Sequence, residues 1–488
     1  MFWSTFKISR QAGIRRSRIL QRRLSERSLA GSPPLSSGIA CGSVPVVASS
    51  DLVGAMVIRL KSWLARLCLM MVGLLPLGTA AQITGPLPPN VAPPGSPQAA
   101  ALAPLLTPFN LIEPRFGDFF LIPRVELDET YNSNIFATTT SPTYDLITAL
   151  APSFDLVSNF PRNALNLHGT SLLQVYADHP AQNTQDGAVS VDGRLDVTGH
   201  SSFYGSAQVA HQHISYGSPN SPGNIAQPVT YWDYVARAGY TQAGRRFSYN
   251  VDAGVAAIQY NAALLVGGGV SPQSSGDAAA YDAAVRVNYE IIPDYLGFIR
   301  LGGSLYNYWH AVFNNSAVGR IDLGLQILPR HLISGQVYVG YLLQNFAASS
   351  PGSTNVPDYG GRLVWSVTPL TTLTLNGLRT FLTGNFSNPS LAIPGPAGNG
   401  YLATTITANA EHELMRDLLV NLNAGYENDS FQGITRTDNA FNAGAGVTYF
   451  VTRNLYLGGT LNYYQRISTA SGSSYSQNVL MLRIGTQF

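Results

Sequence analysis

Apolar and polar residues alternate with a period of two along most of the chain from residue 119 onward. This period is that of a β-strand whose two faces meet different surroundings, and an amphipathic helix does not produce it. In the segment 186–199, for example, one parity holds Val189, Val191, Leu195 and Val197, and the other holds Ser190, Asp192, Arg194 and Asp196.

Short turn-forming segments separate these strands, and they recur every ~40 residues. Between two such turns the sequence predicts a strand, a longer Gly, Ser, Asn and Pro-rich loop, and a returning strand. Eight short turns and nine loops give about 18 strands, and an even number places both ends of the sheet on one side. The eight turns are at 158–163, 198–202, 241–245, 292–295, 328–331, 368–371, 414–417 and 451–454.

Segregation of short turns from long loops is typical of transmembrane β-barrels. Strands of about 12 to 14 residues are long enough to cross a bilayer at a tilt, whereas a propeller needs four short strands per blade. The sequence therefore predicts an all-β, antiparallel up-and-down barrel of about 18 strands. Because an open sheet edge is costly in lipid, the last strand must pair with the first, around 119–131.

The composition agrees with a membrane barrel. Only 11% of the residues are charged and 45% are hydrophobic, with 47 Gly, 25 Tyr and 20 Phe, yet no apolar run after the N-terminal region approaches the ~20 residues of a membrane helix. Residues 1–81 contain 11 of the 29 basic residues and 2 of the 27 acidic ones, so the remainder has 18 Arg against 25 acids. A net charge of about −7 after residue 81 gives no reason to expect nucleic acid binding.

The N-terminal region is predicted to contain three segments before the barrel at 115–488. Residues 56–81 have a basic start, an apolar core of about eleven residues and small residues at the end, which are the parts of a secretory signal peptide. We expect 1–55 to be an over-extended gene start, with a genuine basic extension as the alternative. Residues 82–114 are Pro- and Ala-rich and predict a disordered periplasmic segment. Both cysteines, Cys41 and Cys68, precede residue 82, so no disulfide or thiol chemistry is expected in the barrel.

Charged residues within the predicted strands occupy the parity opposite to Leu, Val and Ile. A charge facing lipid costs ~2–4 kcal/mol at the bilayer midplane, so these side chains are expected to face the lumen. They would either select solutes through their field or pair with one another and hydrate the wall. Arg379 is an exception, since it shares parity with apolar neighbours near a loop end. The candidate pore-lining residues are Asp192, Arg194, Asp233, Arg237, Asp252, Asp282, Arg286, Glu290, Arg300, Arg320, Asp322, Arg362, Glu411 and Arg483.

Aromatic residues near strand ends predict girdles at the two membrane interfaces. Phe247 and Tyr295 lie near the short turns. The loop-side set is Tyr131, Tyr176, Tyr260, Tyr306, Tyr308, Tyr426 and Tyr463.

Catalytic and metal chemistry finds little support in the sequence. His211 and His213 share a strand face without a nearby third ligand, and the carboxylates at 411 and 413 point away from His412. No nucleophile, base and acid fall together on one rim. We therefore expect no enzyme activity, no cofactor and no metal.

The C-terminal strand ends on Phe488, an aromatic residue at the end of an alternating segment. This arrangement resembles the signal read by the outer-membrane assembly machinery of Gram-negative bacteria.

The segment 125–138, "VELDETYNSNIFAT", and the segment that follows it resemble the opening of a family of outer-membrane β-barrel porins. The genes of this family often accompany exopolysaccharide or capsule export systems. Asn132 stands where the family pattern has Asp. The matching residues are Tyr131, Asn134, Ile135, Phe136, Asp145, Pro152, Pro161 and Arg162. The resemblance implies an outer-membrane barrel and, for some members, a role in surface polysaccharide.

These observations predict a pore that works by passive diffusion or as an export conduit, with exopolysaccharide as one candidate solute. Lumen-facing Tyr456 and Tyr464 would favour sugars. The expected partners are outer-membrane lipid, the barrel-assembly machinery and a polysaccharide export complex. The alternative is a structural or adhesive barrel with partner-binding loops and a blocked lumen.

Overall fold

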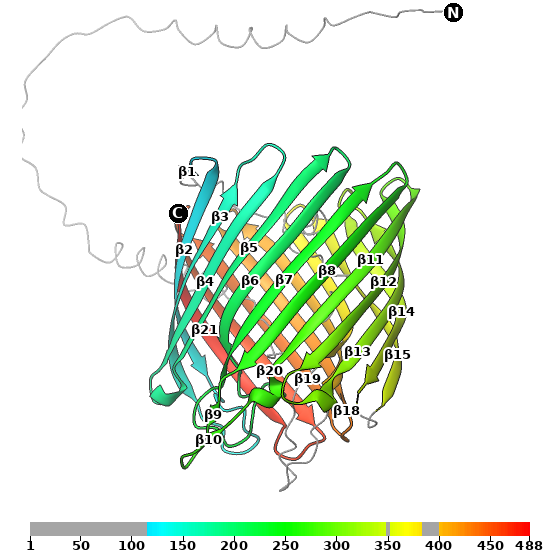
Figure 1. Cartoon of the computed structure of the whole chain (residues 1–488). Helices are drawn as coiled ribbons and strands as arrows, with labels where there is room; N and C mark the ends of the chain where they lie inside the picture. Colours follow the sequence, from blue (N-terminus) through cyan, green and yellow to red (C-terminus); the bar gives the residue numbers. More distant parts are fainter. Residues whose placement is uncertain (1–114, 348–351, 383–399) are drawn as a thin grey trace, which may run out of the picture. The chain divides into compact units, whose positions relative to one another are not determined.

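A computed structural model describes residues 115–347, 352–382 and 400–488. The predicted N-terminal extension, signal peptide and Pro-rich segment lie outside the described residues. The described chain forms one sheet in which each long strand pairs antiparallel with its neighbours in sequence, apart from two small strands in a loop (Figure 1). Among the described residues, no helix is long and apolar enough to span a membrane.

The predicted count of 18 long strands is confirmed. A two-residue strand, β1 (Arg115–Phe116), pairs with the start of β2. The long strands are β2 (Phe119–Asn132), β3 (Asp145–Ser158), β4 (Ala164–Tyr176), β5 (Thr184–Thr198), β6 (Ser201–His213), β7 (Thr230–Ala243), β8 (Phe247–Tyr260), β11 (Ala278–Ile292), β12 (Tyr295–Tyr308), β13 (Ser316–Ile327), β14 (Ile333–Phe346), β15 (Ser353–Thr368), β16 (Thr371–Leu382), β17 (Gly400–Met415), β18 (Leu418–Gln432), β19 (Thr437–Phe450), β20 (Leu455–Ser468) and β21 (Tyr475–Gln487).

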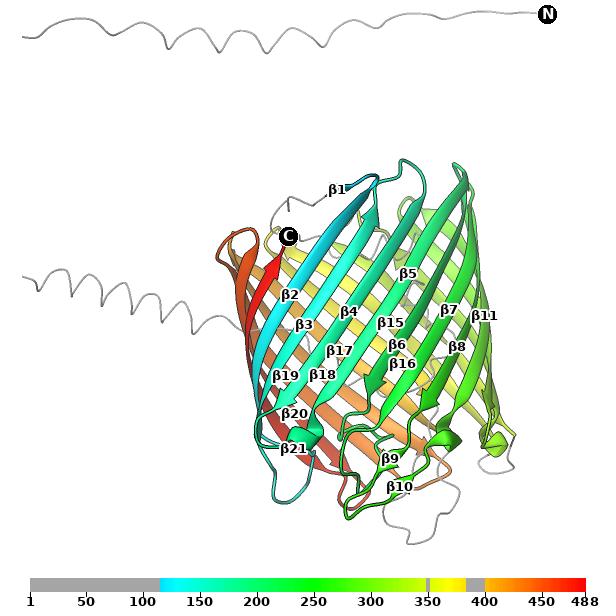
Figure 2. The same cartoon turned by 60° about the vertical axis from the view of Figure 1, so that its left-hand side comes forward.

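All eight predicted short turns lie between consecutive strands, and they occupy one end of the barrel, the short-turn end. At the other end, the loop end, the described residues form three 3-10 turns, η1 (Pro180–Gln182), η2 (Ser274–Gly276) and η3 (Val312–Asn314), and a small hairpin of β9 (Ala263–Leu264) and β10 (Val270–Ser271). Figures 1 and 2 show β1 and the C-terminus together at the short-turn end. One loop-end connection is shorter than expected, because only residues 433–436 join β18 to β19.

The sheet closes where the last strand meets the first, as predicted. Nine residue pairs join β2 to β21, from Arg124 with Gln487 to Asn132 with Val479. The neighbouring seam between β2 and β3 holds fourteen pairs. Closure leaves no free edge at this seam, which the membrane requires.

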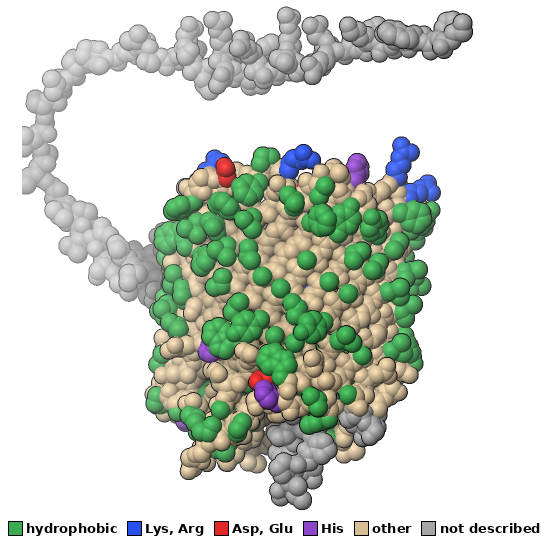
Figure 3. Space-filling model, viewed as in Figure 1, with side chains coloured by type: hydrophobic (Ala, Val, Ile, Leu, Met, Phe, Trp, Pro, Cys, Tyr) green, Lys and Arg blue, Asp and Glu red, His purple; other side chains and the backbone are tan. Residues whose placement is uncertain are grey.

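The two faces of the sheet differ as the alternation predicts. On β13, the side chains of Ile321 and Leu323 are 50% and 60% exposed, whereas Arg320 and Asp322 are 5% and 0% exposed. The exposed face is the outside of the barrel, and its apolar side chains are visible across the wall in Figure 3, with blue cationic groups at the short-turn rim. The outside is therefore suited to lipid, and the polar residues face inward.

Candidate functional site: the inner wall and mouth of the barrel

Every predicted pore-lining charge lies on the inward parity, and none is exposed like the apolar residues beside it. Half of them are half-buried: Asp192, Arg194, Asp233, Glu290, Arg362, Glu411 and Arg483. The other half are buried: Arg237, Asp252, Asp282, Arg286, Arg300, Arg320 and Asp322. These buried charges, with Asp358, form a group that we call the charged belt, on β7 to β15.

The clearest ion pair of the charged belt spans three strands. Arg237 on β7 donates from Nη1 and Nη2 to both carboxylate oxygens of Asp282 on β11, at 2.9 and 3.0 Å. Gly254 on β8 is in register with both residues. A Cβ atom at this position would lie 2.9 Å from Asp282 Oδ1 and 3.0 Å from Arg237 Nη1. The glycine therefore leaves the space that the bidentate pair occupies.

A second cluster lies on β13 to β15. Arg320 Nε is 2.8 Å from Asp358 Oδ2 and 3.9 Å from Asp322 Oδ2. Gly340 is in register with both aspartates. We did not predict Asp358, although it shares the inward parity of Arg362 four residues later in the same strand. Parity alone could have identified it.

Arg286 is held mainly by neutral groups. It donates to Asn288 Oδ1 at 2.7 Å, to Gln326 Oε1 at 2.7 Å and to Gln336 Oε1 at 2.9 Å. Its guanidinium carbon lies 3.7 Å from the ring centroid of Phe298. This side chain is anchored by the wall.

Several of the remaining predicted charges also have partners on the wall. Asp192 Oδ1 lies 3.0 Å from His168 Nε2, Arg194 Nε lies 3.0 Å from Asp196, and Glu411 accepts from Asn409 at 3.2 Å. Arg483 makes two bonds of 2.7 Å to Asp128. Most of the predicted pore-lining charges therefore lie beside a side chain of opposite charge on the wall.

The hairpin of β16 and β17 departs from the wall near its loop end. The last residue pair between β15 and β16 toward the loop end is Gly361 with Gly377. Beyond it, β15 remains paired with β14 as far as Ser353 but has no partner in β16. Arg320 Nη2 donates to the carbonyl of Arg379 at 3.1 Å, which places this part of β16 against an inward-facing side chain. The hairpin end therefore leans into the barrel and narrows the lumen on this side.

Apolar contacts hold the same hairpin end. Phe381 and Leu402, paired across β16 and β17, are buried in a cluster that includes the inward-facing Leu342 and Val318. The side chain of Arg379 does not extend freely to the rim, since its guanidinium carbon lies 5.2 Å from the ring centroid of Tyr359.

The loop 214–229 crosses part of the mouth at the loop end. Ile214, Ile225 and Val229 are buried in the same apolar cluster. Farther along, Arg466 on β20 donates from Nη1 to the carbonyl of Gly217. The loop therefore joins β6 and β7 to β20, which is separated from β6 by five strands of the closed sheet.

Tyr216 belongs to this loop and contacts two other loops, those between β4 and β5 and between β2 and β3. Its hydroxyl donates to Gln182 Oε1 at 2.6 Å, and its ring packs edge-on against Phe136 with centroids 5.2 Å apart. Burial raises the pKa of the Tyr216 hydroxyl to about 12. It is therefore a neutral donor at physiological pH.

The predicted loop-side aromatic girdle is partly wrong. Tyr131 and Tyr463 are 39% and 41% exposed on the outside, as expected. Tyr306 and Tyr308, however, are buried and share the inward parity of Arg300. We assigned these residues by their distance from the loops, without applying the alternation that decides which face a side chain occupies.

Neutral amides line the inner face of β16 to β20, a part of the lumen for which sequence analysis named almost no residue. We call this group of half-buried asparagines the amide wall. Their apolar neighbours Leu375, Leu422 and Leu461 are exposed on the outside, which fixes the inward parity. The members are Asn376, Asn409, Asn421, Asn423, Asn442 and Asn462. We missed them because we searched the inward parity for charge only.

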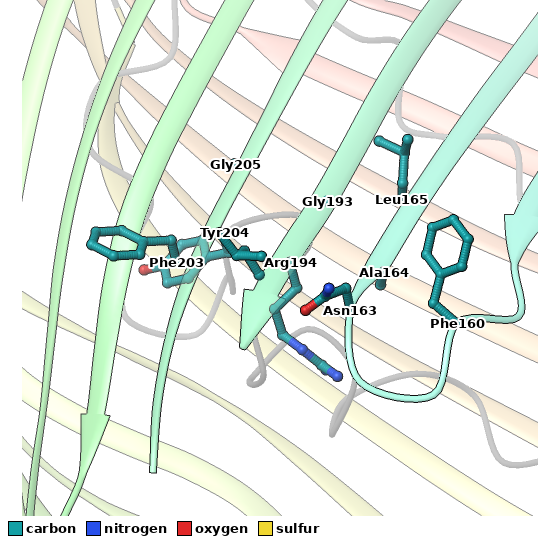
Figure 4. A pocket seen from close by; sticks show the side chains of 10 residues that line it. Phe160, Asn163, Ala164, Leu165, Gly193, Arg194, Phe203, Tyr204 and Gly205 are labelled. Carbon is teal, nitrogen blue, oxygen red and sulfur yellow. The ribbon is translucent and has the colours of Figure 1, made fainter. Parts of the chain in front are cut away.

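A depression of about 550 Å³ lies at the short-turn ends of β4, β5 and β6 (Figure 4). Outward-facing Leu165 and Phe203 line it together with Arg194 and Tyr204. Its lining combines apolar side chains with one guanidinium and offers no nucleophile beside a base. Among the described residues, no group of three or more His, Cys, Asp or Glu could hold a metal ion.

Comparison with solved structures finds outer-membrane proteins of Pseudomonas, at low similarity. The outer membrane protein OpdK of Pseudomonas aeruginosa is 10% identical, with a TM-score of 0.39, over 75% of this chain and 99% of that one. A BenF-like porin from Pseudomonas fluorescens Pf-5 is 12% identical, with a TM-score of 0.38 and the same coverage. The siderophore receptor PirA of Pseudomonas aeruginosa is 9% identical, with a TM-score of 0.39, over 75% and 80% of the two chains. These similarities are too low to bear on function.

No curated protein matches the chain. A family model does match, over residues 107–488, and its description is "Putative beta-barrel porin 2". The match covers most of the chain, including the whole described barrel, and it agrees with the resemblance found in the first strands. The chain belongs to this family, and it is a porin-like β-barrel of the outer membrane.

Proposed function

We propose that this barrel is an aqueous pore that passes polar solutes through the outer membrane by diffusion, and that an exported polysaccharide is among its solutes. The observation that carries the proposal is the inner wall, where charged and amide side chains face inward on nearly every strand. A barrel of 18 strands is wide enough to keep a water-filled channel unless loops or strands fill it.

The pairing of the charges bears on how such a pore would work. Arg237, Arg300 and Arg320 each lie within 4.0 Å of a carboxylate oxygen on the inner wall. Paired charges give a wall that is polar but nearly neutral at each position. We therefore expect weak discrimination between small cations and anions.

Planar-bilayer conductance tests this function. The purified full-length protein should give stable current steps in potassium chloride, with a cation-to-anion permeability ratio near one. Folding is checked independently on a gel, because a folded barrel migrates differently before and after heating. A correctly folded barrel that gives no current would refute the pore.

The alternative is a structural or adhesive barrel with a closed bore. The loop 214–229, anchored to Arg466, and the inward-leaning end of β16 and β17 favour it, because both reduce the open area. The bilayer experiment distinguishes the two functions. The export role has its own test, since deletion of the gene should reduce surface polysaccharide, and unchanged polysaccharide with altered uptake of small solutes would refute it.

A further inference from the structure

We infer that the amide wall binds uncharged, polyhydroxylated solutes, such as a neutral sugar chain, as they pass through the lumen. This inference rests on the proposed pore and adds the chemical class of the solute. It assigns binding to neutral asparagines on β16 to β20, and no binding role to the charged belt on the neighbouring strands.

The asparagines form rows that run from strand to strand around the wall. In one row, Asn409 on β17 pairs with Asn423 on β18, which pairs with Gly444 and then with Asn462. In a parallel row, Asn376 pairs with Thr407, then Gly425, then Asn442. Neighbouring rows are two residues apart along each strand, so hydrogen-bonding groups repeat over the surface in two directions.

Two glycines leave space for the asparagine side chains to lie flat against the wall. The amide of Asn442 lies over Gly425, where an added Cβ atom would be 2.1 Å from Oδ1. The amide of Asn462 lies over Gly444 in the same way, also at 2.1 Å. Because no side chain rises between the amides, the rows present a shallow polar surface and not a set of separate pockets.

The amides are only weakly bonded to one another. Asn442 donates to Asn423 Oδ1 at 3.4 Å, and Asn376 donates to Thr407 Oγ1 at 3.4 Å, both near the upper limit for a hydrogen bond. Among the described residues, Oδ1 of Asn409 and Oδ1 of Asn421 are buried without any hydrogen-bond partner. An amide offers two donors and an acceptor with two lone pairs, so rotation of these half-buried side chains can turn spare groups of both kinds toward the lumen.

Spare donors beside spare acceptors fit hydroxyl groups best, because each hydroxyl both donates and accepts. An anion would use only the donors and a cation only the acceptors. The charged belt differs on this point, since Arg237 and Asp282 satisfy one another with two bonds and are 8% and 5% exposed. A passing solute therefore meets the amides more readily than the buried charges.

Tyrosines adjoin the amide wall toward the loop end. Tyr464 on β20 is in register with Asn442, and its ring centroid is 5.4 Å from that of Tyr475 on β21. Arg466 Nη2 donates to the Tyr464 hydroxyl at 3.2 Å, which fixes the ring. Aromatic faces pack against the apolar faces of sugar rings, so Tyr464 extends the same surface with the complementary chemistry. The Tyr475 ring beside it already lies under the Arg466 guanidinium, whose carbon is 5.6 Å from the ring centroid.

The test is interruption of the ion current by a neutral sugar oligomer. Full-length protein in planar bilayers is titrated with maltohexaose, an uncharged linear glucose hexamer, up to about 10 mM. The oligomer should interrupt the current reversibly. The triple variant Asn409→Ala, Asn423→Ala, Asn442→Ala should bind it at least tenfold more weakly, measured as the fraction of the variant's own unblocked current that is lost, because several neutral hydrogen bonds are removed together.

The matched control is Asn250→Ala. Asn250 also faces inward, but it is buried on the other side of the lumen and donates to Thr241 Oγ1 at 2.7 Å. This variant should be blocked like the unaltered protein. A hexamer of galacturonate, with the same length and one negative charge per ring, should block more weakly than maltohexaose in the unaltered protein.

The outcomes separate the two proposals. If the unaltered protein conducts ions but maltohexaose leaves the current unchanged, the inference is wrong and the pore stands. Equal block of the triple variant, or stronger block by galacturonate, also overturns the inference. Absence of any current from the folded barrel would refute the pore, and the inference with it.

Discussion

Replacement of Arg483 by Gln should weaken the barrel at its closing seam. Arg483 on β21 binds Asp128 on β2 with two hydrogen bonds of 2.7 Å, and its Nη1 lies 3.0 Å from Glu126 Oε2. The seam has nine residue pairs, against fourteen between β2 and β3, and this contact adds a side-chain link between the first long strand and the last.

The expected loss follows from burial. The Asp128 side chain is 6% exposed, and without Arg483 its carboxylate stays buried without a cation. Breaking a buried ion pair costs about 3–5 kcal/mol. The Arg483 side chain is 27% exposed, so water can replace part of the contact. We expect a decrease of about 2–4 kcal/mol in the free energy of unfolding.

The assay is urea unfolding of the barrel in lipid vesicles, followed by the fluorescence of its tryptophans. The matched control is Arg194→Gln, because Arg194 pairs with Asp196 on the same strand and the two side chains are 31% and 26% exposed. The control should cost at most about 1 kcal/mol. Equal losses for the two variants would refute the reasoning that closure depends on the Asp128–Arg483 pair.

Three further predictions test other parts of the barrel. Leu323→Arg, on the 60%-exposed outer face, should lower the free energy of unfolding by ~2–4 kcal/mol in vesicles, and a loss below 0.5 kcal/mol would place this face outside the membrane. Phe381→Ala should free the hairpin end of β16 and β17 and raise the single-channel conductance, whereas an unchanged conductance would show that this end does not narrow the pore. We propose that Phe488 is read by the assembly machinery, so Phe488→Ala should reduce folded barrel in cells but not in purified refolding; an equal decrease in both would assign Phe488 a structural role.

The sequence predicted strand number, turn positions and closure because few physical rules decide them. A strand must be long enough to cross the bilayer, its two faces must differ, and the sheet must have no open edge. The segments around Pro161 and Asp294 could be read as turns because those residues interrupt an alternation that resumes within a few positions. The parity of Arg237 and Asp282 likewise assigned both to the inner face before any contact was known.

Other features depend on contacts that alternation does not contain. The pairing of Arg237 with Asp282 requires knowing which strands are neighbours and that Gly254 lies between them. The inward lean of β16 and β17 depends on packing of Phe381 and Leu402, whose parity alone would place them outside. The amides of the inner wall were overlooked because asparagine is common in the loops too, so only the register shows that these form rows.

The central claim is a closed sheet with lipid outside and water inside, and spin labels along one strand test it most directly. Single cysteines are introduced at positions 419–424 of β18, in a chain shortened to residues 82–488, which contain no cysteine. Each is labelled and reconstituted in bilayers. Labels at Val420, Leu422 and Ala424 should be relaxed by lipid-soluble oxygen, and labels at Leu419, Asn421 and Asn423 by a water-soluble nickel complex. Loss of this alternation, or access of the nickel complex to all six positions, would contradict the account.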